Sequence, residues 1–294
     1  MQQLDGLRPA RLKVGIISAG RVGSAIGAAL ERVDHVVVAA TARSETSRRF
    51  AADRLPDTLI RSPEQVAADS ELLILAVPDT ELAGVVADLV HSDAVAPATI
   101  VVHTSGAAGI GVLAPLAARG ATPLAIHPAM TFTGSDDDIA RLTGCCFGIT
   151  AADEIGYAVA AALVWELGGE PMRVADDARP LYHAALAQAS NHLVTVIADA
   201  MDMLTAALGS PAPEGVPVSR LVAPLARAAL ENALTRGDGA LTGPVARGDA
   251  DAVAAHLRAL DGASPELMQA YRDLSRRTAT RVHARPEIFE VLDR

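Results

Sequence analysis

The sequence has little cysteine and no long apolar run, and each shortage excludes a class of protein. Two cysteines in 294 residues, adjacent at Cys145 and Cys146, cannot form the disulfide framework of a small secreted domain. The strongest apolar runs, LLILAV at 72–77 and TIVV at 99–102, are far shorter than the roughly 20 residues that cross a bilayer. Residues 1–13 contain no apolar segment typical of a signal peptide. We therefore expect a cytoplasmic protein with no membrane partner.

Basic residues are also in short supply. The chain has 25 Lys and Arg against 35 Asp and Glu, a formal net charge of −10. Binding to nucleic acid requires a basic face, so we expect no nucleic-acid partner. An anionic cofactor would have to be held by local groups, because the overall field of the protein is negative.

The first half of the chain alternates short β-type runs with helical stretches. This alternation is typical of an α/β Rossmann domain with a doubly wound parallel sheet, which we place at residues 1–176. No convincing β run follows, so residues 177–294 are predicted to form an all-α C-terminal domain, with a loop at 210–217. The predicted strands are 13–17, 35–41, 59–62, 71–78, 98–106, 121–130, 145–150 and 171–175.

The segment VGIISAGRVGSAIGAAL at 14–30 follows a predicted strand and opens a predicted helix, which is the context of a dinucleotide-binding turn. Read as GxGxxG, it has Ser18 in place of the first glycine, then Gly20 and Gly23. Gly20 would let the backbone approach a pyrophosphate, and Gly23 would let helix and strand pack closely. The backbone of Arg21 and Val22 would lie at the helix N-terminus that faces the phosphates.

The end of the second predicted strand indicates which dinucleotide is bound. NAD sites usually place an acid there, for the ribose 2′-hydroxyl. Here the run is ATARSETSRRF, with Thr41, Arg43 and Ser44 at the strand end and Arg48 and Arg49 a turn later. An arginine and hydroxyl groups suit a 2′-phosphate, so we predict NADP(H) as the cofactor.

Further strand ends are predicted to meet at the same crevice, because ligands of open α/β sheets bind outside the carboxyl ends of the strands. The run AVPD at 76–79 ends one strand; we expect Val77 and Pro78 to bind the cofactor, and Pro78 and Asp79 to turn beside its ribose. His103 and Ser105 end the next, close to the expected position of the nicotinamide. His127 ends the strand after that.

The segment LYHAALAQASN at 181–191 lies on a long helix that we expect to be buried, yet it carries polar side chains among alanines. His183 and Asn191 are eight residues apart and so lie near one face of the helix. This pattern suggests a polar site on the inner side of the helix.

Taken together, IISAGRVGSAI, AVPD, VVHTSG, HPAMTF, LYHAALAQASN and ALTGPVARGD resemble the Rossmann-like proteins that carry a C-terminal domain of unknown function, DUF2520. The resemblance covers nearly the whole chain. It implies the fold of 6-phosphogluconate-dehydrogenase-like enzymes, a group that includes pyrroline-5-carboxylate reductase, ketopantoate reductase and β-hydroxyacid dehydrogenases. Some DUF2520 proteins look like an alternative type of ketopantoate reductase.

The resemblance also implies roles for the polar helix. In ketopantoate reductases and β-hydroxyacid dehydrogenases, the corresponding helix carries Lys-x-x-x-Asn, whose lysine donates a proton to the substrate carbonyl and whose asparagine orients the substrate. Asn191 matches the asparagine, but Ala187 stands where the lysine would be. Our hypothesis is that His183 supplies the proton, alone or with His127 or a bound water, because imidazole titrates near neutral pH.

The segment ALTGPVARGD at 240–249 lies between two predicted helices. By analogy with a Ser/Thr-Pro-Gly segment of pyrroline-5-carboxylate reductases, Thr242, Gly243 and Arg247 are candidates for binding a substrate carboxylate, with Arg247 making the bidentate contact. Asp249 is also a good N-cap for the helix that follows.

The sequence thus predicts an NADPH-dependent oxidoreductase that reduces a small keto acid, with ketopantoate, the precursor of pantoate, as the leading substrate. One alternative is an imine reductase resembling pyrroline-5-carboxylate reductase, and another is a non-catalytic NADP-binding sensor. We expect a homodimer formed through the helical domain. His, Cys and Asp residues show no metal-ligand spacing, so no metal site is predicted.

Overall fold

The structure is a computed structural model that describes residues 11–209 and 217–294. It divides into two compact units, the first ending at Ser190 and the second running from Asn191 to Arg294. The division falls inside one helix, α8 (Arg179–Leu208), whereas the sequence places a domain boundary just before that helix. Except for Pro217, the loop predicted at 210–217 lies outside the described residues.

The first unit is built on an eight-stranded sheet with the order β3-β2-β1-β4-β5-β6-β7-β8. All eight predicted strands are present. The first six strands follow the Rossmann order. The chain runs from β1 through β2 to β3, then returns to the other side of β1 and continues from β4 to β6. The strands are β1 (Lys13–Ile17), β2 (Val36–Ala40), β3 (Leu59–Ile60), β4 (Leu72–Leu75), β5 (Ile100–His103), β6 (Thr122–Pro128), β7 (Cys146–Ala151) and β8 (Glu170–Arg173).

The sheet is mixed, whereas the sequence predicts a parallel one. β1 to β6 are parallel, but β7 pairs antiparallel with β6 and β8 pairs parallel with β7. The reason is the connection from β6 to β7, which contains only the one-turn helix α6 (Asp137–Ala140). The connection has no helix long enough to pack across a face of the sheet, and β7 starts beside the end of β6, with Phe147 opposite Pro128.

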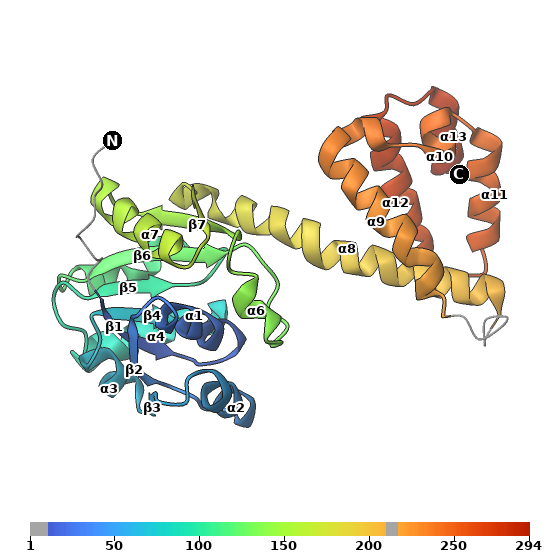
Figure 1. Cartoon of the computed structure of the whole chain (residues 1–294). Helices are drawn as coiled ribbons and strands as arrows, with labels where there is room; N and C mark the ends of the chain where they lie inside the picture. The colour runs from blue at the N-terminus through green and yellow to red at the C-terminus, as the bar shows by residue number, and fades with distance from the viewer. Residues whose placement is uncertain (1–10, 210–216) are drawn as a thin grey trace, which may run out of the picture. The chain divides into compact units, whose positions relative to one another are not determined.

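Helices cover both faces of this sheet (Figure 1). The buried side chains of α1, α2 and α7 form one apolar cluster with the sheet, and those of α3, α4 and α5 form another on the opposite face. The helices are α1 (Arg21–Glu31), α2 (Glu45–Arg54), α3 (Pro63–Ala68), α4 (Asp79–His91), α5 (Ala114–Ala117) and α7 (Glu154–Glu166), with single 3₁₀ turns η1 (Ile110–Leu113) and η2 (Asp176–Ala178).

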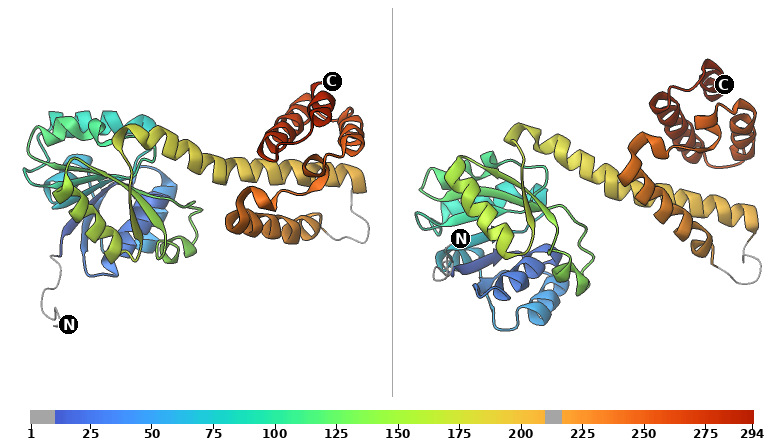
Figure 2. Two further views of the ribbon diagram at one scale, coloured as in Figure 1. Left: turned by 90° about the horizontal axis from the view of Figure 1, so that it is seen from above. Right: turned by 45° about the horizontal axis from the view of Figure 1, so that its top comes forward.

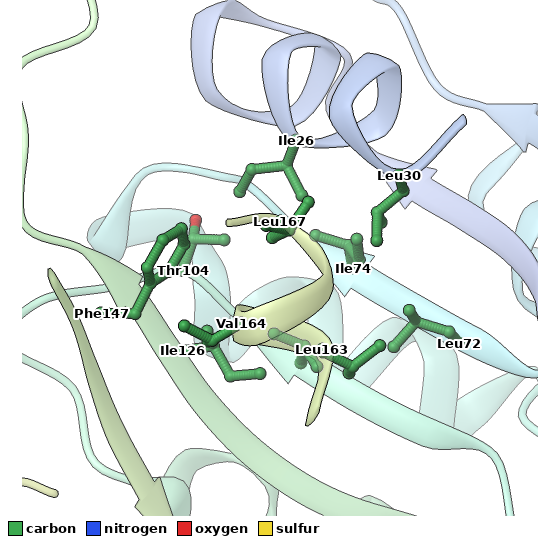
Figure 3. A pocket seen from close by; sticks show the side chains of 11 residues that line it. Ile26, Leu30, Leu72, Ile74, Thr104, Ile126, Phe147, Leu163, Val164 and Leu167 are labelled. Carbon is green, nitrogen blue, oxygen red and sulfur yellow. The ribbon is translucent and has the colours of Figure 1, made fainter. Parts of the chain in front are cut away.

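A small void of about 30 Å³ lies in the first of these clusters, between α1, α7 and the sheet. Figure 3 shows Ile26 and Leu30 of α1 and Leu163 and Val164 of α7 pointing toward the strands around it. Thr104 is the one residue with a side-chain oxygen among those lining it. A void of this size and polarity is a packing defect of the core, and we do not regard it as a ligand site.

The second unit is helical, as the sequence predicts, with its helices around the C-terminal part of α8 (Figure 2). Its small core is formed by Val245, Val253, Leu257, Ala279, Ile288 and Leu292. The helices are α9 (Ser219–Arg236), α10 (Gly243–Arg247), α11 (Ala250–Leu260), α12 (Pro265–Arg281) and α13 (Pro286–Asp293), with a 3₁₀ turn η4 (Gly237–Ala240).

The sequence predicts that α8 is a buried helix, and this prediction is wrong for a single copy of the chain. Leu181 is 76% exposed and Val194 is 70% exposed, and His183 and Asn191 are exposed as well. Alanine-rich apolar composition indicates a helix that packs against something, but it does not say whether the partner belongs to the same chain. Across the described ranges, no helix is both long and apolar enough to cross a membrane.

Candidate functional site

The turn between β1 and α1 has the shape that a dinucleotide-binding turn requires. Ser18 adopts φ +76°, the left-handed conformation that glycine favours, and its N–H donates to Thr41 Oγ1 at 2.8 Å. A Cβ added to Gly23 would overlap the Ser18 carbonyl oxygen, so α1 packs against the turn because residue 23 has no side chain. Gly20 is the N-cap of α1 and provides no side-chain cap, and a Cβ added there would make only ordinary contact, with Ser18 Oγ at 3.7 Å.

Replacing Ser18 with Gly is expected to stabilise the protein. The left-handed conformation costs a non-glycine residue about 1–2 kcal/mol, and the added freedom of glycine in the unfolded chain offsets about half of that gain. We expect the free energy of unfolding to rise by roughly 0.5–1 kcal/mol, measured by urea titration. Ala19, which is buried and has an ordinary φ, is the control: Ala19→Gly should destabilise. A destabilised Ser18→Gly variant would contradict this account.

A hollow of about 380 Å³ lies at the carboxyl ends of β1, β2 and β4, where the strand order reverses. This is the position at which open α/β sheets bind their ligands. Phe50 of α2 and Glu81 of α4 complete its walls. Eight of the residues predicted for cofactor binding line it, namely Ser18, Gly20, Arg21, Thr41, Arg43, Ser44, Val77 and Pro78.

The side chains at the β2 end of this hollow divide into supports and ligand candidates. Thr41 is buried and accepts the Ser18 N–H, so it holds the turn. Ser44 is the N-cap of α2 and accepts the Ser47 N–H at 3.0 Å. Arg43 is exposed and lines the hollow, which leaves its guanidinium as the group suited to a phosphate.

The structure places the other predicted cofactor residues under the surface. Gly23 is buried and Val22 packs against the core. His103 has no exposed surface, and its Nε2 lies 3.1 Å from the Gly109 carbonyl oxygen. Ser105 Oγ accepts the Ala108 N–H at 2.9 Å, so it closes the turn after β5. None of these four residues lines the nucleotide hollow. His103 and Ser105 instead form hydrogen bonds with the backbone of the turn after β5.

A second group of polar side chains gathers where β6 ends and α8 begins. His127 Nδ1 lies 3.0 Å from the Tyr182 hydroxyl, and the His127 and His183 rings meet edge to face at 6.1 Å. Two glycines make room for them. A Cβ on Gly106 would lie 2.5 Å from the His183 ring, and one on Gly148 would lie 2.6 Å from the Tyr182 hydroxyl. The structure therefore brings the predicted pair His127 and His183 together.

Arg179 lies beneath this group with no exposed surface. Its Nη1 donates to Thr150 Oγ1 at 2.9 Å and its Nη2 donates to the Ser105 carbonyl oxygen at 2.8 Å, while Nε has no partner. Among the described residues, no carboxylate lies within ion-pair distance of it. Burial lowers the pKa of Arg179, and the neighbouring Tyr182 and Asp176 counteract that shift.

Burial also controls the protonation of the two histidines that end β5 and β6. It lowers the pKa of His127 to about 4, with help from the positive charges of Arg179 and His183. It lowers the pKa of His103 to about 4, against the hydrogen bond to Gly109. Both imidazoles are therefore neutral at pH 7. Burial raises the pKa of Tyr182, so its hydroxyl keeps its proton.

The neutral histidines predict a loss of stability in mild acid. The unfolded chain, whose histidines titrate near 6.5, binds more protons than the folded chain as the pH falls from 6.5 to 4, so the free energy of unfolding falls over that window. Each histidine contributes at most roughly 3 kcal/mol. Urea titrations at pH 7, 5.5 and 4 should show this slope. An equally steep slope in a His103→Asn, His127→Asn double variant would refute the assignment.

The remaining predicted residues lie in the second unit. Asn191 is exposed on α8. Thr242 is the N-cap of α10 and lines two hollows of this unit, Gly243 starts that helix with φ +90°, and Arg247 is exposed in its last turn. Asp249 caps α11 by accepting the Ala252 N–H at 3.0 Å, as predicted. No cluster that could hold a metal ion occurs among the described residues.

Sequence reasoning missed Arg179 and Tyr182. Both stand in the segment DDARPLYHAAL at 176–186, which also contains His183, and a large basic and an aromatic residue in an alanine-rich helix start are a usable signal. The signal was weak because neither residue type has a fixed role in a dinucleotide fold. Only the packing of α8 against β7 and the turn after β5 shows that the arginine is buried.

The fold and the hollow define this protein as a two-part chain with a Rossmann dinucleotide-type domain and a helical domain. Its family follows from two family models, one for a Rossmann-like domain at residues 1–128 and one for the domain of unknown function DUF2520 at residues 145–278. The chain is a Rossmann-like protein with a C-terminal DUF2520 domain.

Solved structures share this fold at low sequence identity. A Bacteroides fragilis protein assigned as an NADP oxidoreductase matches with 21% identity and a TM-score of 0.73, over 92% of this chain and 98% of that one. An imine reductase from Myxococcus stipitatus, in complex with NAD⁺, has 18% identity and a TM-score of 0.62, over 97% and 100%.

A reductive aminase from Aspergillus terreus, in complex with NADPH and ethyl levulinate, has 18% identity and a TM-score of 0.63, over 97% and 99% of the two chains. Pyrroline carboxylate reductases also share the fold. A search of the curated proteins gave no match.

Proposed function

We propose that this protein is an NADPH-dependent reductase of a small substrate with a polar double bond. The observation that carries the proposal is the hollow at the ends of β1, β2 and β4, which joins an open glycine turn to two arginines, Arg21 and Arg43. The fold is that of proteins whose structures were solved with NADPH or NADP bound, which supports the choice of cofactor.

The residues present suit such a cofactor. Gly20 leaves the N-terminus of α1 open to a pyrophosphate, and Arg43 supplies a charge for a 2′-phosphate. When bound, the nicotinamide supplies a hydride. The protein would then have to supply a proton to the atom that gains negative charge.

The His127, Tyr182 and His183 group is our candidate for that proton supply. Because His127 is neutral at pH 7, it does not store the proton as an imidazolium. In the tautomer with its proton on Nε2, it accepts from the Tyr182 hydroxyl at Nδ1 and can pass a proton on. His183 is exposed beside it and is the better candidate for direct contact with the substrate. Of the hypothesis that His183 supplies the proton, alone or with His127 or a bound water, we therefore favour direct donation by His183.

Two substrate types fit this proposal. Ketopantoate is the substrate implied by the family resemblance, with pantoate as the product. A cyclic imine is the second candidate, and it is supported by the shared fold with imine reductases and reductive aminases. The absence of a lysine at Ala187, where carbonyl reductases of this type carry their proton donor, also favours an imine.

The deciding experiment is NADPH oxidation by the purified protein with ketopantoate and with 2-methyl-1-pyrroline, each compared with NADH. We expect turnover of one of them, faster with NADPH. A His183→Ala variant should lose most of that turnover, while a variant at the exposed His192 of the same helix should not. NADPH binding without turnover of either substrate would support a sensor and overturn the reductase.

We also propose that the chain forms a homodimer through its helical unit. Leu225 and Leu234 on α9 are 69% and 80% exposed, and Val194 on α8 is 70% exposed. Apolar surface of this extent on helices is typical of an interface. Light scattering should give twice the chain mass of 30.3 kDa, and a Leu225→Glu, Leu234→Glu variant should give a single chain mass. A monomer at micromolar concentration would refute the proposal.

A further inference from the structure

The second unit contains a hollow of about 300 Å³ between α8, α10 and α12. Its walls are mostly apolar, with Val196 and Met203 from α8 and Leu267 and Leu274 from α12. This volume and this lining match the sites that proteins use for small organic molecules. None of these side chains belongs to the nucleotide hollow or to the histidine group described above.

The charge of this hollow is negative. Asp199 is the only acidic residue among the described residues that line it, and no Lys, Arg or His lines it. Within the described ranges Asp199 also has no hydrogen bond or ion pair. Asp199 is half-buried, so an organic cation that enters the hollow would meet its carboxylate as a counter-ion.

An aromatic wall stands on the α12 side of the same hollow. The Tyr271 hydroxyl lies 2.7 Å from His256 Nδ1, which fixes the ring position from outside the hollow. The face of a tyrosine ring attracts organic cations, and a carboxylate beside an aromatic ring is a combination that recognises protonated amines.

We propose that this hollow binds the cationic nitrogen of a small organic amine or iminium ion, with Asp199 as its counter-ion. A keto acid would place its own carboxylate against Asp199, so the hollow is unsuited to ketopantoate. The binding itself stands without reference to catalysis.

The test of binding uses three rings of one size, titrated calorimetrically into the full chain saturated with NADPH. Cyclohexylamine is a cation at neutral pH, cyclohexanol is neutral and cyclohexanecarboxylate is an anion. We expect the amine to bind at least about tenfold more tightly than the alcohol, and the carboxylate to bind least, because a charge-assisted hydrogen bond is lost in the latter two.

Two variants locate the effect. Asp199→Asn should remove the preference for the amine over the alcohol, whereas Asp202→Asn, an exposed acid on the same helix outside the hollow, should keep it. Equal binding of amine and alcohol to the unchanged protein would overturn the proposal. So would an amine preference that survives in Asp199→Asn.

Turnover separates this inference from the proposed function. If the amine binds through Asp199 but no imine or carbonyl compound is reduced, the hollow stands and the reductase fails. If an imine or carbonyl compound is reduced but the amine and the alcohol bind equally, the reductase stands and the proposed amine site fails.

Discussion

Replacing Arg43 with Gln is expected to weaken NADPH binding by about tenfold to a hundredfold and to leave NADH binding nearly unchanged. A charge-assisted hydrogen bond to a phosphate contributes about 1.5–3 kcal/mol, and NADH lacks the 2′-phosphate that would accept it. Arg43 is the exposed cation at the β2 end of the nucleotide hollow, in a protein whose net charge is −10, so no general positive field would compensate for its loss. The measurement is the dissociation constant of each dinucleotide, by nucleotide fluorescence.

A matched control is available on the neighbouring helix. Arg49 is exposed and its guanidinium lies 5.8 Å from the Phe50 ring centre, but it does not line the hollow. Arg49→Gln should change neither dissociation constant. If Arg43→Gln weakens NADPH and NADH binding equally, Arg43 contacts a part common to both, and the preference for NADP(H) has another cause.

The position of the nucleotide hollow could be predicted because each of its parts has a local signal. Gly20 and Gly23 stand at a fixed spacing after an apolar run, and Arg43 follows the next run at the place where the cofactor is selected. Parallel strands bring such ends together by topology alone. No knowledge of side-chain packing was needed to expect that Ser18, Arg43 and Pro78 would line one site.

Features that depend on packing could not be predicted in the same way. The direction of β7 depends on how far residues 129–145 reach, and a one-turn helix such as α6 leaves no clear trace in an apolar pattern. His103 was expected beside the cofactor because it ends a strand, but its side chain lies below the turn that Ser105 closes. The end of a strand determines where the backbone of a residue lies. The direction of its side chain depends on the residues that pack around it.

Arg179 raises a question of energetics, because it is a buried cation without a carboxylate partner. Two hydrogen bonds, to Thr150 Oγ1 and to the Ser105 carbonyl oxygen, do not compensate for the removal of a guanidinium from water. In many proteins an apolar residue of similar size at such a position is neutral or stabilising. If Arg179 does not improve stability, it has another role. One such role is electrostatic, because its positive charge lowers the pKa of His127.

Arg179→Met is therefore expected to leave the free energy of unfolding within about 1 kcal/mol of the original, because lost hydrogen bonds and the removed charge oppose one another. It should raise the pKa of His127, since the guanidinium charge is the second largest cause of the low value. It should also lower turnover at least about tenfold, because the turn after β5 and Thr150 lose the guanidinium that holds them beside Tyr182 and His127. The pKa is measured by following the His127 ring protons by NMR across pH.

Two further variants distinguish a positioning role from a purely structural one. Arg179→Lys keeps the charge and should restore the low pKa of His127, while Arg173→Met, at an exposed arginine on β8 that pairs with Glu154, should change neither the pKa nor turnover. A purely structural role predicts the opposite pattern. Arg179→Met would then lose more than about 3 kcal/mol of stability. Its folded fraction would show an unchanged His127 pKa and full activity. In that event the arginine holds the start of α8 against β7 and has no part in the chemistry.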